Sequence, residues 1–163
     1  MLPEYIKQIE IAKSKKAETK KFLDRLRKLK PADLDVVTNE LHDQAFTHID
    51  CLQCANCCKT TGPLLKGKDI ERLAKHFSEK PSSFTEKYLR IDEDGDYVFK
   101  KMPCPFLGSD NYCGVYEDRP SACRNYPHTQ QRNILQKLSI TYHNTMICPA
   151  VAEVVEELKK KYL

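Results

Sequence analysis

CLQCANCC, residues 51–58, contains four thiols within eight positions: Cys51, Cys54, Cys57 and Cys58. Two overlapping Cys-x-x-Cys pairs run directly into a vicinal Cys-Cys pair. A Cys-x-x-Cys step turns the backbone tightly enough to direct both sulfur atoms at one metal centre. Four more cysteines follow singly: Cys104, Cys113, Cys123 and Cys148. We therefore predict metal ligation by all eight thiolates, which could fill two four-sulfur sites or one site with thiols to spare.

Disulfides, or cysteines buried as small hydrophobes, are the competing interpretations. Disulfides need an oxidising compartment, yet residues 1–10 contain Pro3, Glu4, Lys7 and Glu10 and no apolar stretch of a signal peptide. No run approaches the roughly 18 apolar residues of a membrane span. We therefore expect a cytoplasmic protein, whose thiols stay reduced and can bind metal.

The net charge of +4 is concentrated at the N-terminus. Residues 1–30 contain ten Lys or Arg against four Asp or Glu, so the rest of the chain is close to neutral. This asymmetry predicts two parts. Residues 1–48 would form an N-terminal helical hairpin extension, and residues 49–163 a cysteine-cluster metal-binding domain with a C-terminal helix.

Residues 3–29 predict one long helix, with a packing seam at positions 5, 9, 12, 16, 19, 23 and 26. Lys30-Pro31 ends it, and a second helix over residues 32–46 would complete the hairpin. The cations on one side of the first helix could face nucleic acid, but no aromatic residues lie between them to stack on bases. We therefore expect a docking surface for a protein partner and no nucleic-acid binding. Removal of residues 1–30 is expected to leave metal binding intact.

The predicted fold class is mainly α with a small β-hairpin, the cysteine-rich domain being otherwise irregular. Helices are expected over residues 68–77, 81–89 and 150–162. Asp94-Gly95 indicates a β-hairpin within residues 89–101. Asp118 is expected to cap a short helix that carries Cys123. Residues 135–142 are compatible with a strand or a helix.

The cysteine spacing favours iron–sulfur over zinc. Zinc sites commonly use paired Cys-x-x-Cys arms from separate hairpins, whereas overlapping pairs occur here in one place only. A Cys-x-x-Cys-x-x-Cys run completed by a distant Cys-Pro is the spacing of a four-iron cluster in bacterial ferredoxins. Cys104-Pro105 or Cys148-Pro149 could complete the run, and the choice stays open. We expect a 4Fe–4S cluster, with zinc as the alternative.

Three cations flank cysteines: Lys59, Arg119 and Arg124. They could offset the negative charge of a thiolate site, or the two arginines could simply pair with neighbouring acidic residues. His48, three residues before Cys51, is interpreted as a loop residue rather than as a ligand.

Two sequence blocks resemble the YkgJ-type cysteine-cluster family, which is also described as a zinc- or iron-chelating domain. The first block is Cys51-x-x-Cys54-x-x-Cys57-Cys58. The second is Cys104-Pro105-Phe106-Leu107 with Cys113-Gly-Val-Tyr116-Glu117-x-Arg119-Pro120-x-x-Cys123-Arg124-x-Tyr126-Pro127. The resemblance covers roughly residues 50–150. It implies a bacterial cytosolic metal-binding domain with the eight cysteines as ligands.

Three kinds of function are compatible with these features. A structural or accessory binding module is favoured, because eight soft ligands leave no obvious open position for a substrate. The domain also resembles the metal-binding part of flagellin lysine methylases, so an accessory or redox subunit of a methyl-transfer enzyme is the alternative. A thiol redox module using Cys54 and Cys57 would need a thioredoxin-like setting that the sequence lacks. The sequence identifies no catalytic residue and favours a binding protein over an enzyme.

Overall fold

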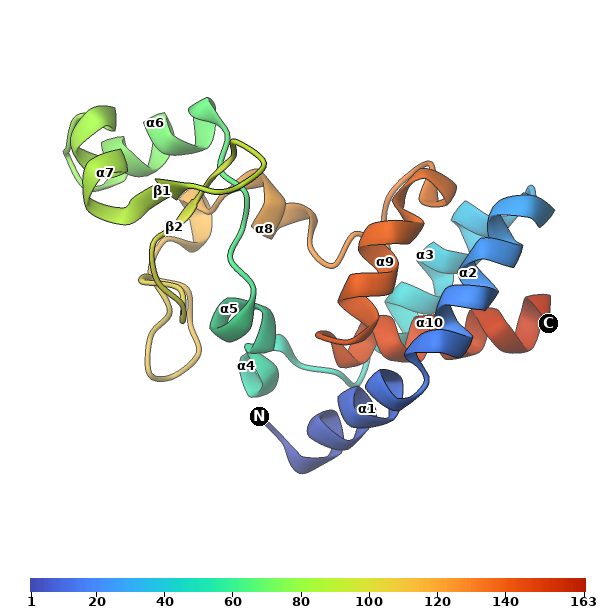
Figure 1. Ribbon diagram of the computed structural model, residues 1–163. Coiled ribbons are helices and arrows are strands. Elements are labelled where there is room, and N and C mark those ends of the chain that lie inside the picture. Colours follow the sequence, from blue (N-terminus) through green and yellow to red (C-terminus); the bar gives the residue numbers. More distant parts are fainter. The chain divides into compact units, whose positions relative to one another are not determined.

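The computed structural model describes residues 1–163 and divides into two compact units. Unit 1 comprises Met1–Cys54 and Pro127–Leu163, and unit 2 comprises Ala55–Tyr126. Each unit has a hydrophobic core of its own. Helices predominate, and the only sheet is a two-stranded antiparallel hairpin (Figure 1). The prediction of a mainly α protein with a small β-hairpin is therefore confirmed.

Unit 1 is entirely helical. Its helices are α1 (Pro3–Ser14), α2 (Lys16–Leu29), α3 (Leu34–Ala45), α4 (Cys51–Cys54), the 3-10 helix η2 (Ile134–Lys137), α9 (Leu138–Thr145) and α10 (Pro149–Tyr162). Proline stands in the first turn of α1 and of α10, where a missing N–H costs nothing. The segment over residues 135–142, which the sequence left open between strand and helix, is helical.

The prediction of one helix over residues 3–29 is wrong at Lys15. This residue leaves the helical conformation, with φ −92° and ψ 10°, and separates α1 from α2. The predicted seam continues on both sides of the break, because Tyr5 on α1 and Leu23 on α2 are buried. Lys16, the polar position in the middle of that seam, is exposed. A lysine is costly to bury, so the change of direction keeps its ammonium group in water.

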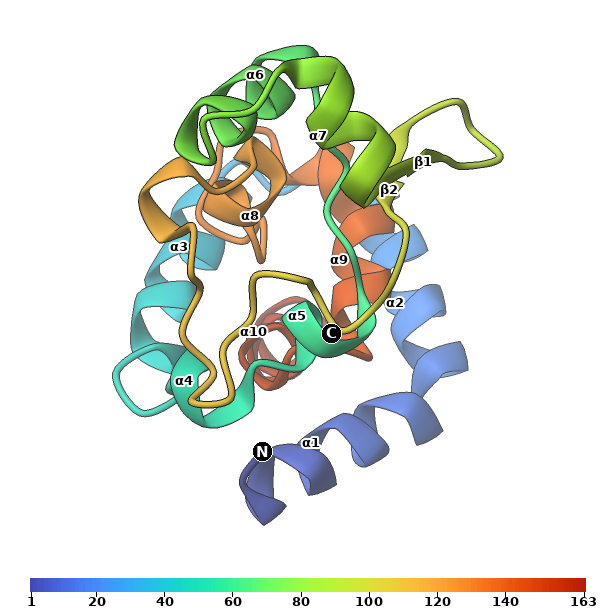
Figure 2. The same cartoon turned by 90° about the vertical axis from the view of Figure 1, so that its left-hand side faces the viewer.

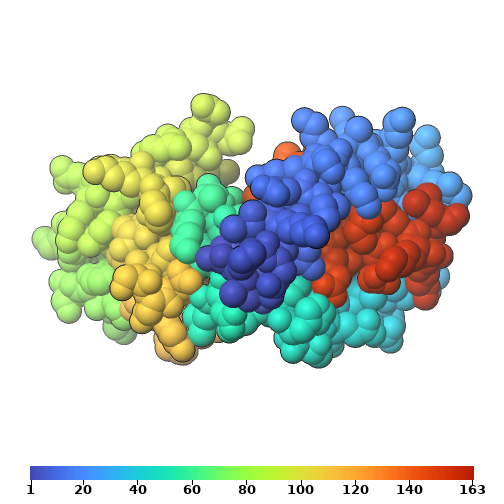
Figure 3. Space-filling model, turned by 90° about the horizontal axis from the view of Figure 1, so that it is seen from below, coloured from blue at the N-terminus to red at the C-terminus, as the bar shows by residue number.

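α10 is the central helix of unit 1. Its buried apolar residues include Val151, Val154, Val155 and Leu158, each worth about 1.5–3 kcal/mol when fully buried. Figure 2 shows α10 close to end-on, between α3 on one side and α2 and α9 on the other. Figure 3 shows the blue N-terminal helix α1 lying beside the red α10. The most extensive packing of α3 is against α10, so the two helices of the predicted N-terminal hairpin share a core with the C-terminal helix.

Residues 1–48 lie wholly within unit 1, together with residues from the far end of the chain. The boundary between an N-terminal extension and a metal-binding domain at residues 48 and 49 stays a prediction. None of the helices combines the length and the apolar character that crossing a lipid bilayer would require.

Unit 2 is built from short helices around the β-hairpin. Its elements are α5 (Asn56–Thr60), α6 (Gly67–His76), α7 (Pro81–Tyr88), β1 (Leu89–Ile91), β2 (Tyr97–Phe99), the 3-10 helix η1 (Tyr116–Asp118) and α8 (Ser121–Asn125). Leu89 pairs with Phe99 and Ile91 with Tyr97 in the hairpin. Gly95 has φ +83°, a conformation that glycine adopts without strain, as expected from the Asp-Gly turn.

Aromatic side chains fill the core of unit 2. Phe106 stacks on Phe77 with ring centroids 5.2 Å apart and meets Phe99 edge-on at 5.5 Å. Phe84 is fully buried and lies 6.2 Å from Phe106. Because Phe106 follows Cys104-Pro105, its packing against these rings anchors the segment that carries the first cysteine of the second sequence block.

Asp118 is not the cap of the helix that carries Cys123, as the sequence predicted. It lies in η1, and α8 begins at Ser121 with Pro120 as its N-cap residue. The carboxylate of Asp118 instead pairs with Nδ1 of His76 at 2.8 Å. A carboxylate already engaged by an imidazole on α6 does not satisfy the first N–H groups of α8.

Candidate metal centre

The eight predicted ligands divide between the two units. Cys51, Cys54 and Cys148 belong to unit 1, and Cys57, Cys58, Cys104, Cys113 and Cys123 belong to unit 2. All eight are thiols rather than disulfides. Each unit thus contains cysteines of the first sequence block and cysteines from later in the chain.

The unit 2 thiols come from three segments that backbone hydrogen bonds fix to one another. The N–H of Cys104 donates to the carbonyl of Cys58 on α5 at 2.8 Å. Cys104 and Cys113 stand at the two ends of a tight loop, in which Leu107 and Cys113 form an isolated antiparallel bridge. Cys123 lies in the single turn of α8, where its N–H donates to the carbonyl of Pro120 at 2.9 Å.

The same thiols affect one another electrostatically. Burial, with the neighbouring thiols of Cys58 and Cys113, raises the pKa of Cys104 to about 11. Burial, with the thiols of Cys58, Cys104 and Cys113, raises the pKa of Cys123 to about 12. Cys58, Cys104, Cys113 and Cys123 are therefore near enough to interact electrostatically, and we refer to them as the thiol group of unit 2.

Cys58 differs from the other members of this group. A hydrogen bond with the Cys57 thiol, whose sulfur lies 4.0 Å away, lowers the pKa of Cys58 to about 7. Burial opposes that shift and the positive charge of Lys59 assists it. Cys58 therefore gives up its proton more readily than Cys104 or Cys123.

Unit 1 contains three of the eight thiols. Cys51 and Cys54 are one helical turn apart on α4, and Cys148 is the N-cap residue of α10. Cys54 is a buried member of the unit 1 core, and Cys148 packs against that core. Burial raises the pKa of Cys148 to about 12, with Cys51 and Cys54 adding to the increase and hydrogen bonds from the Val151 and Ala150 backbone opposing it.

Tyr5 of α1 fixes the backbone that leads into α4. Its hydroxyl accepts a hydrogen bond from the N–H of Asp50 at 3.0 Å and donates to the carbonyl of His48 at 3.4 Å. His48 itself pairs through Nε2 with Glu153 at 3.0 Å. This pairing is compatible with the interpretation of His48 as a loop residue rather than a ligand.

Comparison with known proteins bears directly on these cysteines. A family model named CxxCxxCC, described as "Putative zinc- or iron-chelating domain", matches residues 50–149. The chain belongs to the CxxCxxCC family. No curated protein and no solved structure matches it.

All eight thiols fall within the part of the chain that the CxxCxxCC family model covers. No three of the His, Cys, Asp or Glu side chains already converge as a metal site. The chemistry of the donors fits the family description, because soft thiolates select zinc and iron–sulfur clusters. One such group could be held in unit 2 by Cys58, Cys104, Cys113 and Cys123. Three further ligands could come from Cys51, Cys54 and Cys148 in unit 1.

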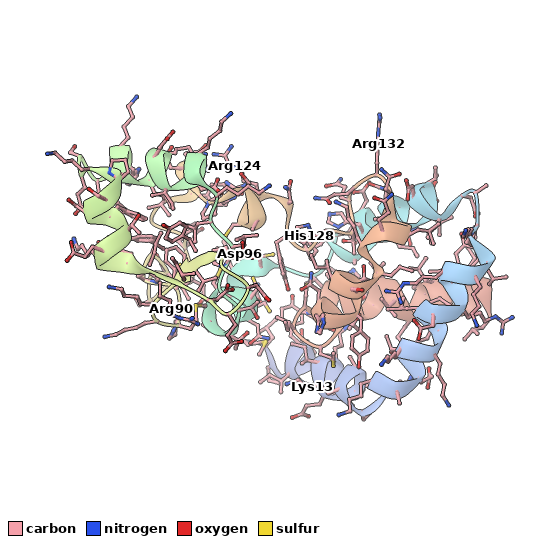
Figure 4. All side chains as sticks on the ribbon, turned by 45° about the horizontal axis from the view of Figure 1, so that its top comes forward. Lys13, Arg90, Asp96, Arg124, His128 and Arg132 are labelled. Carbon is pink, nitrogen blue, oxygen red and sulfur yellow. The ribbon has the colours of Figure 1, made fainter.

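The cations that flank the cysteines have two kinds of role in the structure. Arg119 opposes the increase in the pKa of Cys123, and its guanidinium stacks on the Tyr116 ring with 3.8 Å to the centroid. Arg124, labelled on α8 in Figure 4, donates instead to the backbone carbonyls of Glu117 and Arg119. Pairing of both arginines with acidic side chains, one of the two alternatives that the sequence left open, is therefore not what organises this segment.

Asp69, the only buried carboxylate in the chain, was not predicted from the sequence as a functional residue. It lies at the start of α6 and accepts hydrogen bonds from Ser121 at the start of α8. The usual sequence sign of such a residue is a Ser, Thr, Asp or Asn cap three positions earlier. Lys66 occupies that position, so the sign is absent.

Proposed function

We propose that this CxxCxxCC protein is a metal-binding module that holds an iron–sulfur cluster or zinc through cysteine thiolates. The proposal depends most on the four thiols of unit 2, which come from three segments of the chain; the thiols of Cys58 and Cys113 add to the raised pKa of both Cys104 and Cys123. Four thiolates are a complete ligand set for a structural zinc ion or for a 4Fe–4S cluster. The family description supports metal chelation independently.

Between the two metals we favour the iron–sulfur cluster, with zinc as the alternative. The overlapping Cys-x-x-Cys pairs and the two Cys-Pro dipeptides favour a cluster, because paired arms in two places would be expected of zinc. Lys59 and Arg119 support either choice, since both counter the negative charge of thiolates in unit 2. A bound cluster would supply one-electron chemistry, whereas zinc would supply structure alone.

We further propose that Cys51, Cys54 and Cys148 are metal ligands in unit 1. Cys148 adds to a Cys-x-x-Cys pair, and the thiols of Cys51 and Cys54 contribute to its raised pKa. This grouping favours Cys148-Pro149 over Cys104-Pro105 as the Cys-Pro that completes the first sequence block. Cys57 neighbours Cys58 in the sequence, and the experiment below assigns it to a centre.

The role that fits these features is that of a structural, redox or accessory module in the reducing cytoplasm. Both thiol groups are part of folded units, so a bound metal would stabilise each fold as well as any partner complex. Ile6 and Ile11 on α1 are 41 % and 44 % exposed, which supports a protein partner on the N-terminal helices. An accessory subunit of a methyl-transfer enzyme is the alternative.

Anaerobic purification followed by metal, sulfide and absorption analysis tests the proposal. Iron with acid-labile sulfide and a brown colour is the expected result, and colourless protein with stoichiometric zinc supports the alternative. Protein that neither retains nor takes up either metal under reducing conditions would refute metal binding.

Single alanine variants test the ligand groups. Cys113→Ala should lower the metal content of unit 2 alone, and Cys148→Ala that of unit 1 alone. The double variant should lose the metal of both units. If Cys57→Ala loses the metal of one unit, Cys57 belongs to the centre of that unit. Unchanged metal content in Cys113→Ala would overturn the unit 2 ligand set.

A further inference from the structure

The carboxylate of Asp69 joins the starts of two helices in unit 2. Only 1 % of the residue is exposed. Its Oδ2 atom accepts a hydrogen bond from the N–H of Lys66, the N-cap residue of α6, at 2.9 Å. Its Oδ1 atom accepts from the N–H of Ser121 at 3.0 Å and from the Ser121 hydroxyl at 2.9 Å. Ser121 is the first residue of α8, so this one side chain fixes α8 to α6.

Arg72, one turn further along α6, holds the same segment. Its Nη2 atom donates to Oδ1 of Asp69 at 2.7 Å and to the carbonyl of Arg119 at 2.8 Å. Its Nε atom donates to the carbonyl of Asp118 at 3.1 Å. The planar guanidinium can make these bonds together because its donors have a fixed fork geometry. Asp69 and Arg72 thus hold the main chain from Asp118 to Ser121.

The other contacts of this segment are the ion pair between Asp118 and His76, hydrogen bonds from Arg124 to backbone carbonyls, and the buried Pro120. Neither η1 nor α8 contains a buried residue, so apolar packing beyond that of Pro120 contributes little to the direction of α8. Removing a carboxylate from water is costly, and a buried ion pair contributes little net stability against an apolar replacement. A gain in stability therefore does not explain why a carboxylate is buried at position 69, whereas a role in orienting α8 does.

We propose that Asp69 and Arg72 are positioning residues of the unit 2 metal centre, which fix the direction in which α8 presents Cys123. The inference rests on the proposed function for the identity of the ligand group, whereas the placement of Cys123 can be measured without metal. Metal–thiolate distances are tight, with deviations of about 0.2 Å already significant. A small displacement of α8 therefore weakens the bond to Cys123.

Asp69→Asn in the full-length protein tests the proposal, with Co²⁺ as the spectroscopic probe. Asparagine keeps the shape and one acceptor oxygen, but it removes the charge that Arg72 pairs with. We expect about 10- to 100-fold weaker Co²⁺ binding in unit 2, the range for residues that orient metal ligands. We also expect altered visible absorption of the thiolate-bound Co²⁺.

Asp35→Asn is the matched control in unit 1. Asp35 also holds the start of a helical segment, because its carboxylate accepts from the N–H groups of Asn133 at 2.8 Å and Ile134 at 2.9 Å. We expect this variant to melt at a lower temperature while the Co²⁺ spectrum of unit 2 is unchanged. If Asp69→Asn behaves like Asp35→Asn, with a lower melting temperature and an unchanged spectrum, the positioning role is overturned.

Arg72→Lys provides a milder variant should Asp69→Asn fail to fold. Lysine retains the positive charge beside Asp69 but lacks the fork that reaches both Asp118 and Arg119, so weaker Co²⁺ binding is again expected. In metal-free protein, we expect iodoacetamide to alkylate Cys123 several-fold faster in either variant than in the parent, with Cys148 as the internal reference. Equal alkylation rates would overturn the proposal even if the parent protein proved to bind no metal.

Discussion

Burial dominates the chemistry of the candidate ligands at the scale of single residues. It is the largest cause of the raised pKa of Cys104, Cys123 and Cys148, and backbone hydrogen bonds or cations offset only part of it. A buried thiol keeps its proton at neutral pH unless a cation replaces that proton. Ligands with this property remain neutral in the metal-free protein, which avoids several uncompensated negative charges in one small volume.

His42 makes the stability of unit 1 dependent on pH. Burial lowers the pKa of its imidazole below the ordinary value of 6.5, although the charge of Asp43 opposes the shift. Its contribution to stability is therefore complete above about pH 6.5 and is lost as the pH falls through the depressed value in the folded protein. We expect the free energy of unfolding of metal-free protein, measured by urea denaturation, to fall between pH 7 and pH 5. His42→Gln should make this dependence shallower.

Thr129→Val separates burial from hydrogen bonding at this site. The Thr129 hydroxyl lies 2.8 Å from Nδ1 of His42. Because burial is the main cause of the lowered pKa, the valine variant should keep the pH dependence while losing some stability at every pH. A dependence that disappears in Thr129→Val but persists in His42→Gln would contradict this account.

At the scale of elements, periodicity and turn chemistry predicted most helices and the hairpin. Helix starts were predicted correctly at Pro3 and Pro81, and the hairpin was predicted correctly from the Asp94-Gly95 pair. Two features had no such signal. Lys15 interrupts a sequence of strong helix formers, and Ala55 adopts φ +49° between α4 and α5 although alanine gives no indication of a left-handed turn. Tertiary packing decides the conformation at both positions.

The candidate site was also predicted only in part. Cysteine spacing predicted the eight candidate ligands. Their division into two groups could not be predicted, because it depends on contacts between distant segments, such as the hydrogen bond from the Cys104 N–H to the Cys58 carbonyl. Periodicity does not report such contacts. Asp69 was missed for the same reason, since its partner Ser121 lies 52 residues away in the sequence.

The loop between Cys104 and Cys113 depends on Gly108. A Cβ atom at this position would lie 2.6 Å from Oδ1 of Asp110 and 3.3 Å from the carbonyl oxygen of Tyr112. That carboxylate accepts a hydrogen bond from the N–H of Tyr112 at 3.0 Å, so it cannot move away without breaking the turn. We expect Gly108→Ala to destabilise unit 2 by about 1–3 kcal/mol, the range for overpacking. Metal titration should show weaker binding in unit 2.

Gly67→Ala is the matched control for this loop. No atom lies within 4 Å of the position that a Cβ atom would take at Gly67, which begins α6. Alanine has the higher helix propensity, so unchanged or slightly higher stability is expected. Equal losses of metal affinity in the two variants would show that the close approach at Gly108 is unimportant.

At the scale of the whole molecule, each unit has its own core and its own group of thiols. The N-terminal helices contribute Tyr5, Phe22, Leu23 and Leu26 to the core that also contains Cys54. At about 1.5–3 kcal/mol per buried side chain, these four contribute about 6–12 kcal/mol. That amount is comparable to the whole stability of a typical domain, about 5–15 kcal/mol. The structure therefore argues against the expectation, drawn from sequence, that residues 1–30 can be removed without effect on metal binding.

Deletion of residues 1–30 should unfold unit 1 and leave unit 2 folded. Hydrogen exchange is expected to show loss of amide protection in α3, α9 and α10, with protection retained in α6 and α7. Metal analysis should show loss of the share bound by Cys51, Cys54 and Cys148 only. Loss of protection throughout the chain would show instead that the two units fold as one.

A pair of leucines on α2 tests the same point without a deletion. Leu26 is fully buried in the unit 1 core, whereas Leu29, less than one turn away, is 51 % exposed. Leu26→Ala creates a cavity and should cost about 2–5 kcal/mol, while Leu29→Ala should change stability by less than about 0.5 kcal/mol. If α2 belongs to the core that holds Cys54, the metal bound in unit 1 should dissociate at a lower urea concentration in Leu26→Ala alone. Identical urea midpoints for metal release in the two variants would mean that the N-terminal helices do not support the unit 1 thiols.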